Sequence, residues 1–146
     1  MFLLKFLFTI SLYFYSYALY STNASIENIR FSDNHKNKSF RIVLDLTHKA
    51  PYSVFTLNNT PRLVVDIETK NVKSKLKNYS NFIKNIRSNN TDKNVTRIVF
   101  DLKNEAYVLK HFYLQKNDKK FYRLVIDVKE KVNIEKPLVS KRNNKK

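Results

Sequence analysis

Four six-residue segments of this 146-residue chain share one pattern of hydrophobic and polar positions. Each segment begins with arginine, carries aspartate at its fifth position, and has hydrophobic residues at its second, fourth and sixth positions. Because successive side chains of a strand point to opposite faces, each segment predicts a strand with one hydrophobic face and one face that carries Arg and Asp. The segments are Arg41–Leu46, Arg62–Ile67, Arg97–Leu102 and Arg123–Val128.

These segments belong to two longer repeats, residues 26–69 and 83–128, joined by a charged crossover at 70–82. Each repeat has a short opening strand, a polar turn, an Arg…Asp strand, an aromatic-rich strand and a second Arg…Asp strand. Self-similarity on this scale indicates a duplicated four-strand unit. The opening strands are Ile26–Arg30 and Ile83–Arg87, and the aromatic-rich strands are Ala50–Leu57 and Ala106–Leu114.

The strand patterns and the polar turns between them predict an all-β fold. Each unit has one apolar face to cover, so we expect a sandwich of two pseudo-symmetric four-stranded sheets that cover each other. A short helical turn is expected only near residues 73–79. The predicted core consists of Ile42, Leu44, Leu46, Leu63, Val65, Ile67, Ile98, Phe100, Leu102, Leu124, Ile126 and Val128.

The charged faces predict ion pairs between neighbouring strands. If the two Arg…Asp strands of one repeat are antiparallel neighbours, the expected pairs are Arg41–Asp66, Asp45–Arg62, Arg97–Asp127 and Asp101–Arg123. The alternative is that the intervening aromatic-rich strand separates them.

The two ends of the chain differ from the repeats. Residues 1–24 fit a secretory signal peptide, because one lysine precedes an apolar run that is shorter than the ~20 residues of a membrane-spanning helix. Cleavage is expected near residue 18 or 24, with no transmembrane span afterwards. Residues 129–146 predict a basic, disordered tail. The domain then occupies residues 25–128.

The amino-acid composition excludes several kinds of functional site. The absence of cysteine excludes disulfides and thiolate metal sites, and the three histidines lack the spacing of metal ligands, so no metal or cofactor is predicted. The absence of glycine excludes the usual phosphate-binding loops. The formal net charge of +16 leaves a lysine-driven polyanion binder open, although the Asn-, Ile- and Lys-rich composition equally fits AT-rich codon usage. The export signal argues against nucleic acid.

The order of these segments resembles the AMIN domain, found at the N-terminus of periplasmic N-acetylmuramoyl-L-alanine amidases and in type IV pilus secretins. The resemblance rests on Ile26–Arg30, Arg41–Leu46, Ala50–Leu57 and Arg62–Ile67, and on the duplication. It implies a sandwich of two symmetry-related four-stranded sheets that binds peptidoglycan and directs its parent enzyme to the division septum.

The zinc amidase module that follows this domain in those enzymes is not recognisable in the sequence. We therefore expect a non-catalytic, periplasmic module that binds peptidoglycan, with a separate amidase or a divisome protein as further candidate partners. The alternative is a truncated or split amidase, in which the tail begins the linker to a catalytic part.

Two groups of residues are candidate contacts with peptidoglycan. Arginine forks suit the carboxylates of stem peptides, and aspartates accept hydrogen bonds from sugar hydroxyls. The competing interpretation is that these residues form ordinary surface ion pairs worth under ~1 kcal/mol each. Tyrosines at matching places in the two aromatic-rich strands suit stacking on sugar rings or simple packing. Arg30 and Arg87 are secondary candidates, and His111 is expected to be a half-buried strand residue. The primary candidates are Arg41, Asp45, Arg62, Asp66, Arg97, Asp101, Arg123, Asp127, Tyr52 and Tyr107.

Overall fold

The computed structural model describes residues 24–69, 71–77, 80–92, 94–114 and 120–131. The predicted signal peptide and almost all of the predicted tail lie outside this range. Within the described residues every regular element is a strand, and no helix has the length and apolar character needed to cross a membrane. The predicted all-β class is confirmed, whereas residues 73–77 form no helical turn.

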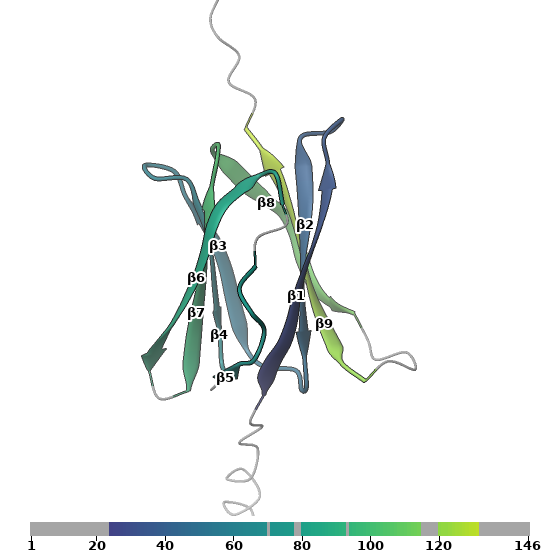
Figure 1. Cartoon of the computed structure of the whole chain (residues 1–146), viewed down its shortest axis with the longest axis vertical. Coiled ribbons are helices and arrows are strands. Elements are labelled where there is room, and N and C mark those ends of the chain that lie inside the picture. The colour runs from purple at the N-terminus through teal and green to yellow at the C-terminus, as the bar shows by residue number, and fades with distance from the viewer. Residues whose placement is uncertain (1–23, 70, 78–79, 93, 115–119, 132–146) are drawn as a thin grey trace, which may run out of the picture.

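Two sheets form the layers of a sandwich (Figure 1). The five-stranded sheet has the order β5-β1-β2-β9-β8, and the four-stranded sheet has the order β3-β4-β7-β6. All neighbours are antiparallel except β1 and the short β5. The strands are β1 Ser25–Asn34, β2 Ser39–Leu46, β3 Tyr52–Leu57, β4 Arg62–Ile67, β5 Asn71–Val72, β6 Ile83–Asp92, β7 Val95–Leu102, β8 Ala106–Leu114 and β9 Tyr122–Glu130.

Each sheet contains strands from both repeats. The first Arg…Asp strand of one repeat pairs with the second of the other, so that β2 lies beside β9 and β4 beside β7. The prediction that the two Arg…Asp strands of one repeat are neighbours is therefore wrong. After β2, residues 47–51 carry the chain to the opposite sheet, where β3 pairs with β4 and so keeps β4 away from β2.

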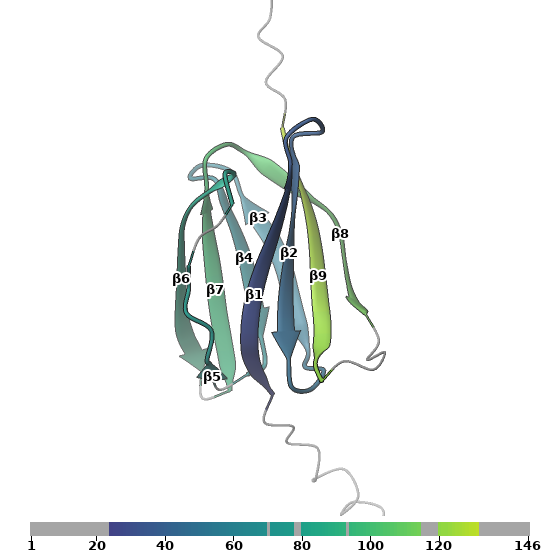
Figure 2. The ribbon, with the colours of Figure 1, turned by 45° about the vertical axis from the view of Figure 1, so that its right-hand side comes forward.

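Apart from β5, the two sheets are equivalent. The order β1-β2-β9-β8 in one sheet corresponds to β6-β7-β4-β3 in the other, each built from opening, first Arg…Asp, second Arg…Asp and aromatic-rich strands. Figure 2 shows the two layers from a second direction. The fifth strand comes from the crossover, where Asn71–Val72 pairs with the start of β1.

The core lies between the sheets, and all twelve predicted core residues are buried. Alternation explains this result, because the second, fourth and sixth positions of every Arg…Asp strand point inward. Phe100 joins the two layers: it lies opposite Leu63 and Ile86 in its own sheet, and its ring contacts that of Phe31 on β1 edge-on, with 6.2 Å between the centroids.

The crossover closes one side of the sandwich. Val72 and Leu76 pack against the core, and the amide of Lys73 donates to the carbonyl of Ile26. Further along, the Asp33 carboxylate accepts hydrogen bonds from the hydroxyl of Ser80 and from the amide of Asn81. These contacts fix the segment that links the repeats along the edges of β1 and β6.

Candidate functional site

The outer face of each sheet carries a row of alternating arginines and aspartates on three neighbouring strands. The inward register of the hydrophobic residues leaves the first and fifth positions of each Arg…Asp strand on the outside. We call these two sets the charged rows. The row of the five-stranded sheet contains Arg30, Arg41, Asp45, Arg123 and Asp127, and the row of the four-stranded sheet contains Arg62, Asp66, Arg87, Arg97 and Asp101.

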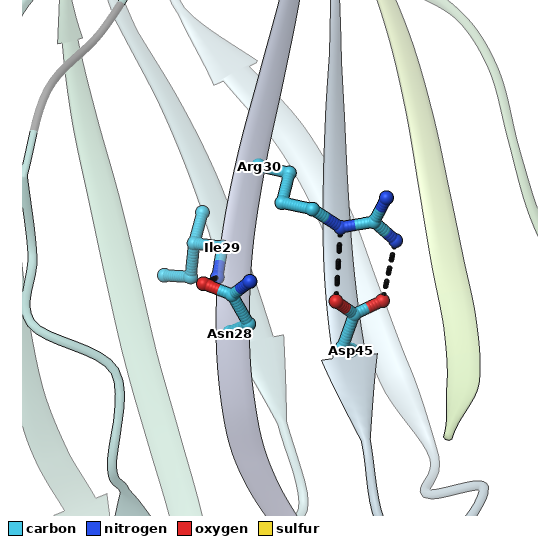
Figure 3. Close-up of polar contacts among 4 residues, drawn as sticks. All are labelled: Asn28, Ile29, Arg30 and Asp45. Atoms are coloured by element: carbon cyan, nitrogen blue, oxygen red, sulfur yellow. Dashed lines mark hydrogen bonds and ion pairs between the residues drawn. The ribbon is translucent and has the colours of Figure 1, made fainter. Parts of the chain in front are cut away.

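In the five-stranded sheet, Arg30 on β1 binds Asp45 on β2 with two hydrogen bonds (Figure 3). Its Nε lies 2.9 Å from one carboxylate oxygen and its Nη2 lies 2.6 Å from the other. Arg30 lies after a register shift in β1, where the side-chain oxygen of Asn28 accepts a hydrogen bond from the amide of Ile29. The Asp45 carboxylate thus has both oxygens engaged by Arg30.

A second ion pair joins the two repeats across the same sheet. Arg41 on β2 lies directly opposite Asp127 on β9, and its Nε and Nη2 lie 2.6 and 2.9 Å from the two carboxylate oxygens. Lys110 on β8 adds a longer contact of 3.6 Å to Asp127.

The four-stranded sheet repeats this arrangement. Arg87 binds both oxygens of Asp101 at 3.3 and 3.0 Å, and Arg97 binds both oxygens of Asp66 at 2.7 Å. These pairs correspond to Arg30–Asp45 and Arg41–Asp127, respectively.

One arginine in each row has no such bidentate partner. Arg123 lies opposite Asp45, and Arg62 lies opposite Asp101, but both aspartates are already bound by Arg30 and Arg87. Arg62 keeps a single contact of 3.6 Å to Asp101, and Arg123 makes no ion pair within the described part of the chain.

The predicted ion pairs within a repeat are therefore replaced by pairs between repeats and by pairs with the opening strands. Arg41 bonds Asp127 rather than Asp66, and Arg97 bonds Asp66 rather than Asp127. Arg30 and Arg87, which sequence reasoning treated as secondary, each occupy a central aspartate. Their identical place at the end of the two Ile-x-Asn-Ile-Arg segments is the signal in the sequence that could have made them primary candidates.

The paired arginines lower the pKa of three aspartates. Hydrogen bonds from Arg97, Arg87 and Arg41 hold the pKa of Asp66, Asp101 and Asp127, respectively, below the usual value, against the smaller effect of burial.

The lowered pKa values of these aspartates contribute to the stability of the domain against acid. A carboxyl group with a lower pKa in the folded state stabilises the fold above its unfolded pKa of about 3.9, and loses this contribution as the pH falls toward the folded value. We expect the melting temperature to fall below about pH 4 in thermal unfolding followed by circular dichroism. Arg97→Gln should make this fall shallower, because Asp66 then titrates at a more ordinary pKa. An unchanged slope in that variant would contradict the assignment.

The two candidate tyrosines do not occupy equivalent places. Tyr52 lies opposite Ile67, and the residue opposite Val128, the counterpart of Ile67, is Val108. Tyr52 packs against the core, whereas Tyr107 is 41% exposed. Of the two, Tyr107 is the one whose ring is available at the surface.

Tyr52 belongs to an aromatic cluster where β3 meets β8. Its hydroxyl lies 3.0 Å from Nδ1 of His111, which is exposed rather than half-buried, and its ring meets that of Tyr113 edge-on. The Tyr113 hydroxyl donates to the carbonyl of Ala50 and accepts from its amide, and burial raises the pKa of Tyr113. This cluster ties the two sheets together.

Three shallow hollows border the charged rows. One of about 270 Å³ lies beside Arg41 and Asp127, and another of about 270 Å³ lies beside Asp66 and Tyr52. The third, of about 410 Å³, lies at the β3–β4 turn and includes Arg62. All three are open, which suits an extended polymer or a peptide end better than an enclosed small molecule.

Comparison with known proteins identifies the family. A family model for the AMIN domain matches residues 28–122, most of the chain. A search of curated proteins gave no match. AMIN domains are peptidoglycan-targeting modules of amidases and occur in periplasmic proteins. The duplicated strands, the two-layered all-β fold and the family match agree, and the chain belongs to the AMIN domain family.

Proposed function

We propose that this chain is a non-catalytic peptidoglycan-binding module of the periplasm, exported by residues 1–24, that positions itself, or a separate amidase or divisome partner, at the septum or cell envelope. The observation that carries the proposal is the repetition of one charged row on two opposite outer faces. Stability alone does not require such repetition, because exposed ion pairs contribute little.

The charged rows have unused hydrogen-bonding capacity. The bidentate pairs use Nε and Nη2 of Arg30, Arg41, Arg87 and Arg97, and Nη1 of each donates no hydrogen bond within the part of the chain that the structure describes. Peptidoglycan offers carboxylates on its peptides and hydroxyls on its sugars. Tyr107, exposed on β8, can add a ring to a sugar face.

Co-sedimentation with purified sacculi tests this function. We expect the folded chain to pellet with sacculi and to release no stem peptides from them. Release of peptides by the isolated chain would contradict the non-catalytic role. Binding that disappears steeply with salt and shows no preference for sacculi over other polyanions would instead favour the lysine-driven alternative.

A further inference from the structure

We infer that Arg62 and Arg123 are the carboxylate receptors of the two outer faces and that their ligand is the free carboxyl end of a short peptide. This inference rests on the proposed function and specifies which part of peptidoglycan is recognised: the peptide rather than the sugar. The two arginines are equivalent in the duplicated fold, since each is the first residue of the second Arg…Asp strand of its repeat.

Each row has three arginines but only two aspartates. Arg30 and Arg41 take both oxygens of Asp45 and Asp127, which leaves Arg123 as the third.

The four-stranded sheet leaves Arg62 in the same way, apart from its single 3.6 Å contact with Asp101. Each face therefore carries one guanidinium group whose charge is not matched by a carboxylate of its own. An anionic ligand that lies on either row gains most at this arginine.

The Nε atoms of Arg62 and Arg123 are both buried and lack a hydrogen-bond partner among the described residues. Buried donors without partners are rare. The Arg62 side chain remains 35% exposed, and its 3.6 Å contact with Asp101 is the one ion pair that either arginine makes among the described residues. A guanidinium group whose Nε is already buried has fewer orientations to lose when its Nη groups bind a carboxylate.

A shallow hollow lies next to Arg62. It is lined by the end of β3 and the turn that follows, and Leu57 there is 44% exposed. Asn58, Asn59 and Thr60 supply amide and hydroxyl groups beside the guanidinium group. The end of a peptide with a small apolar last residue fits this hollow: its carboxylate would bind Arg62, its amides would bind the turn, and its side chain would contact Leu57.

Arginine variants test the inference by sacculus binding. Arg62→Gln with Arg123→Gln should weaken binding by about 10- to 100-fold, because hydrogen bonds to a charged group are lost. Lys36→Gln with Lys75→Gln is the control matched in charge, since both lysines are exposed and lie outside the charged rows. Arg41→Gln with Arg97→Gln should lose less binding than the Arg62 and Arg123 pair, because those two charges are already neutralised.

The ligand is tested with two sacculus preparations and one soluble probe. Wild-type protein should bind intact sacculi and lose most binding to glycan strands stripped of peptides by an amidase. In nitrogen-15 NMR, a tripeptide ending in D-alanyl-D-alanine should shift the Nε–H signals of Arg62 and Arg123, and the same peptide with an amidated end should not. Arg62→Lys should restore only part of the affinity, because lysine lacks the planar fork.

The outcomes separate the two levels of the argument. Equal binding to stripped and intact sacculi would overturn the peptide inference and leave the proposed function standing. Absence of binding to both would reject the proposed function itself. Equal loss in the lysine control and in the Arg62 and Arg123 variant would show that only net charge matters, and would also overturn the inference.

Discussion

Replacing Phe100 with alanine is expected to destabilise the domain by about 3–5 kcal/mol, because a large buried ring is replaced by a cavity. Phe100 is fully buried, lies opposite Leu63 and Ile86, and meets Phe31 of the other sheet. Folded domains have a free energy of unfolding of only ~5–15 kcal/mol, so this loss is a large fraction of the stability. The melting temperature should fall by more than about 10 °C in thermal denaturation.

The matched control is Phe55→Ala. Phe55 is the same residue type but lies on β3 with 38% of its surface exposed, so its truncation should cost much less. Equal shifts in the two variants would mean that Phe100 does not join the layers as described.

Cutting the chain between Lys77 and Ser80 is expected to leave both pieces unfolded when they are separate. Residues 24–77 contain the hairpins β1–β2 and β3–β4, which belong to different sheets, and their neighbours β9 and β7 lie in the other piece. Isolated hairpins are marginally stable in water at best. Mixing the two pieces should restore the β signal in far-ultraviolet circular dichroism. The midpoint of thermal unfolding of the mixture should then depend on the protein concentration.

A variant of the second piece provides the control. Ile126 is fully buried and lies opposite Ile42, so Ile126→Asp in residues 80–131 should prevent recovery. A piece of residues 24–77 that folds as a monomer would contradict the pairing of strands between repeats. A concentration-dependent homodimer of that piece would agree with it, since a second copy then supplies the equivalent strands.

The sequence predicted the parts of the fold that depend on alternation. Every hydrophobic position chosen for the core is buried, because period two determines which face each residue occupies. It also predicted that arginine on one strand meets aspartate on the next, since equal Arg…Asp spacing makes antiparallel strands complementary.

The same regularity prevented prediction of the partner strand. The spacing is identical in all four copies, so β2 is as complementary to β4 as to β9. The choice depends on residues 47–51, a short link with buried Ala50 that takes the chain across to the other sheet. The fifth strand, β5, is too short for any periodic signal.

The sequence predicted which residues belong to the candidate site, but not which of them are already paired with one another. Sequence alone gave the eight charged residues of the Arg…Asp strands equal weight. The structure distinguishes them because Arg30 and Arg87 reach Asp45 and Asp101 from neighbouring strands, an effect of register shifts near the start of β1 and β6. The matching of the tyrosines failed because Tyr107 follows Ala106 directly, whereas Pro51 separates Tyr52 from Ala50.

The pairing between repeats also dictates when the domain can form during synthesis. The last strand to be synthesised, β9, lies between β2 and β8. Arg41 on β2 forms its ion pair with an aspartate that follows it by 86 positions in the chain. Contacts between such distant segments close slowly. The five-stranded sheet therefore cannot be completed on the ribosome until β9 has been translated.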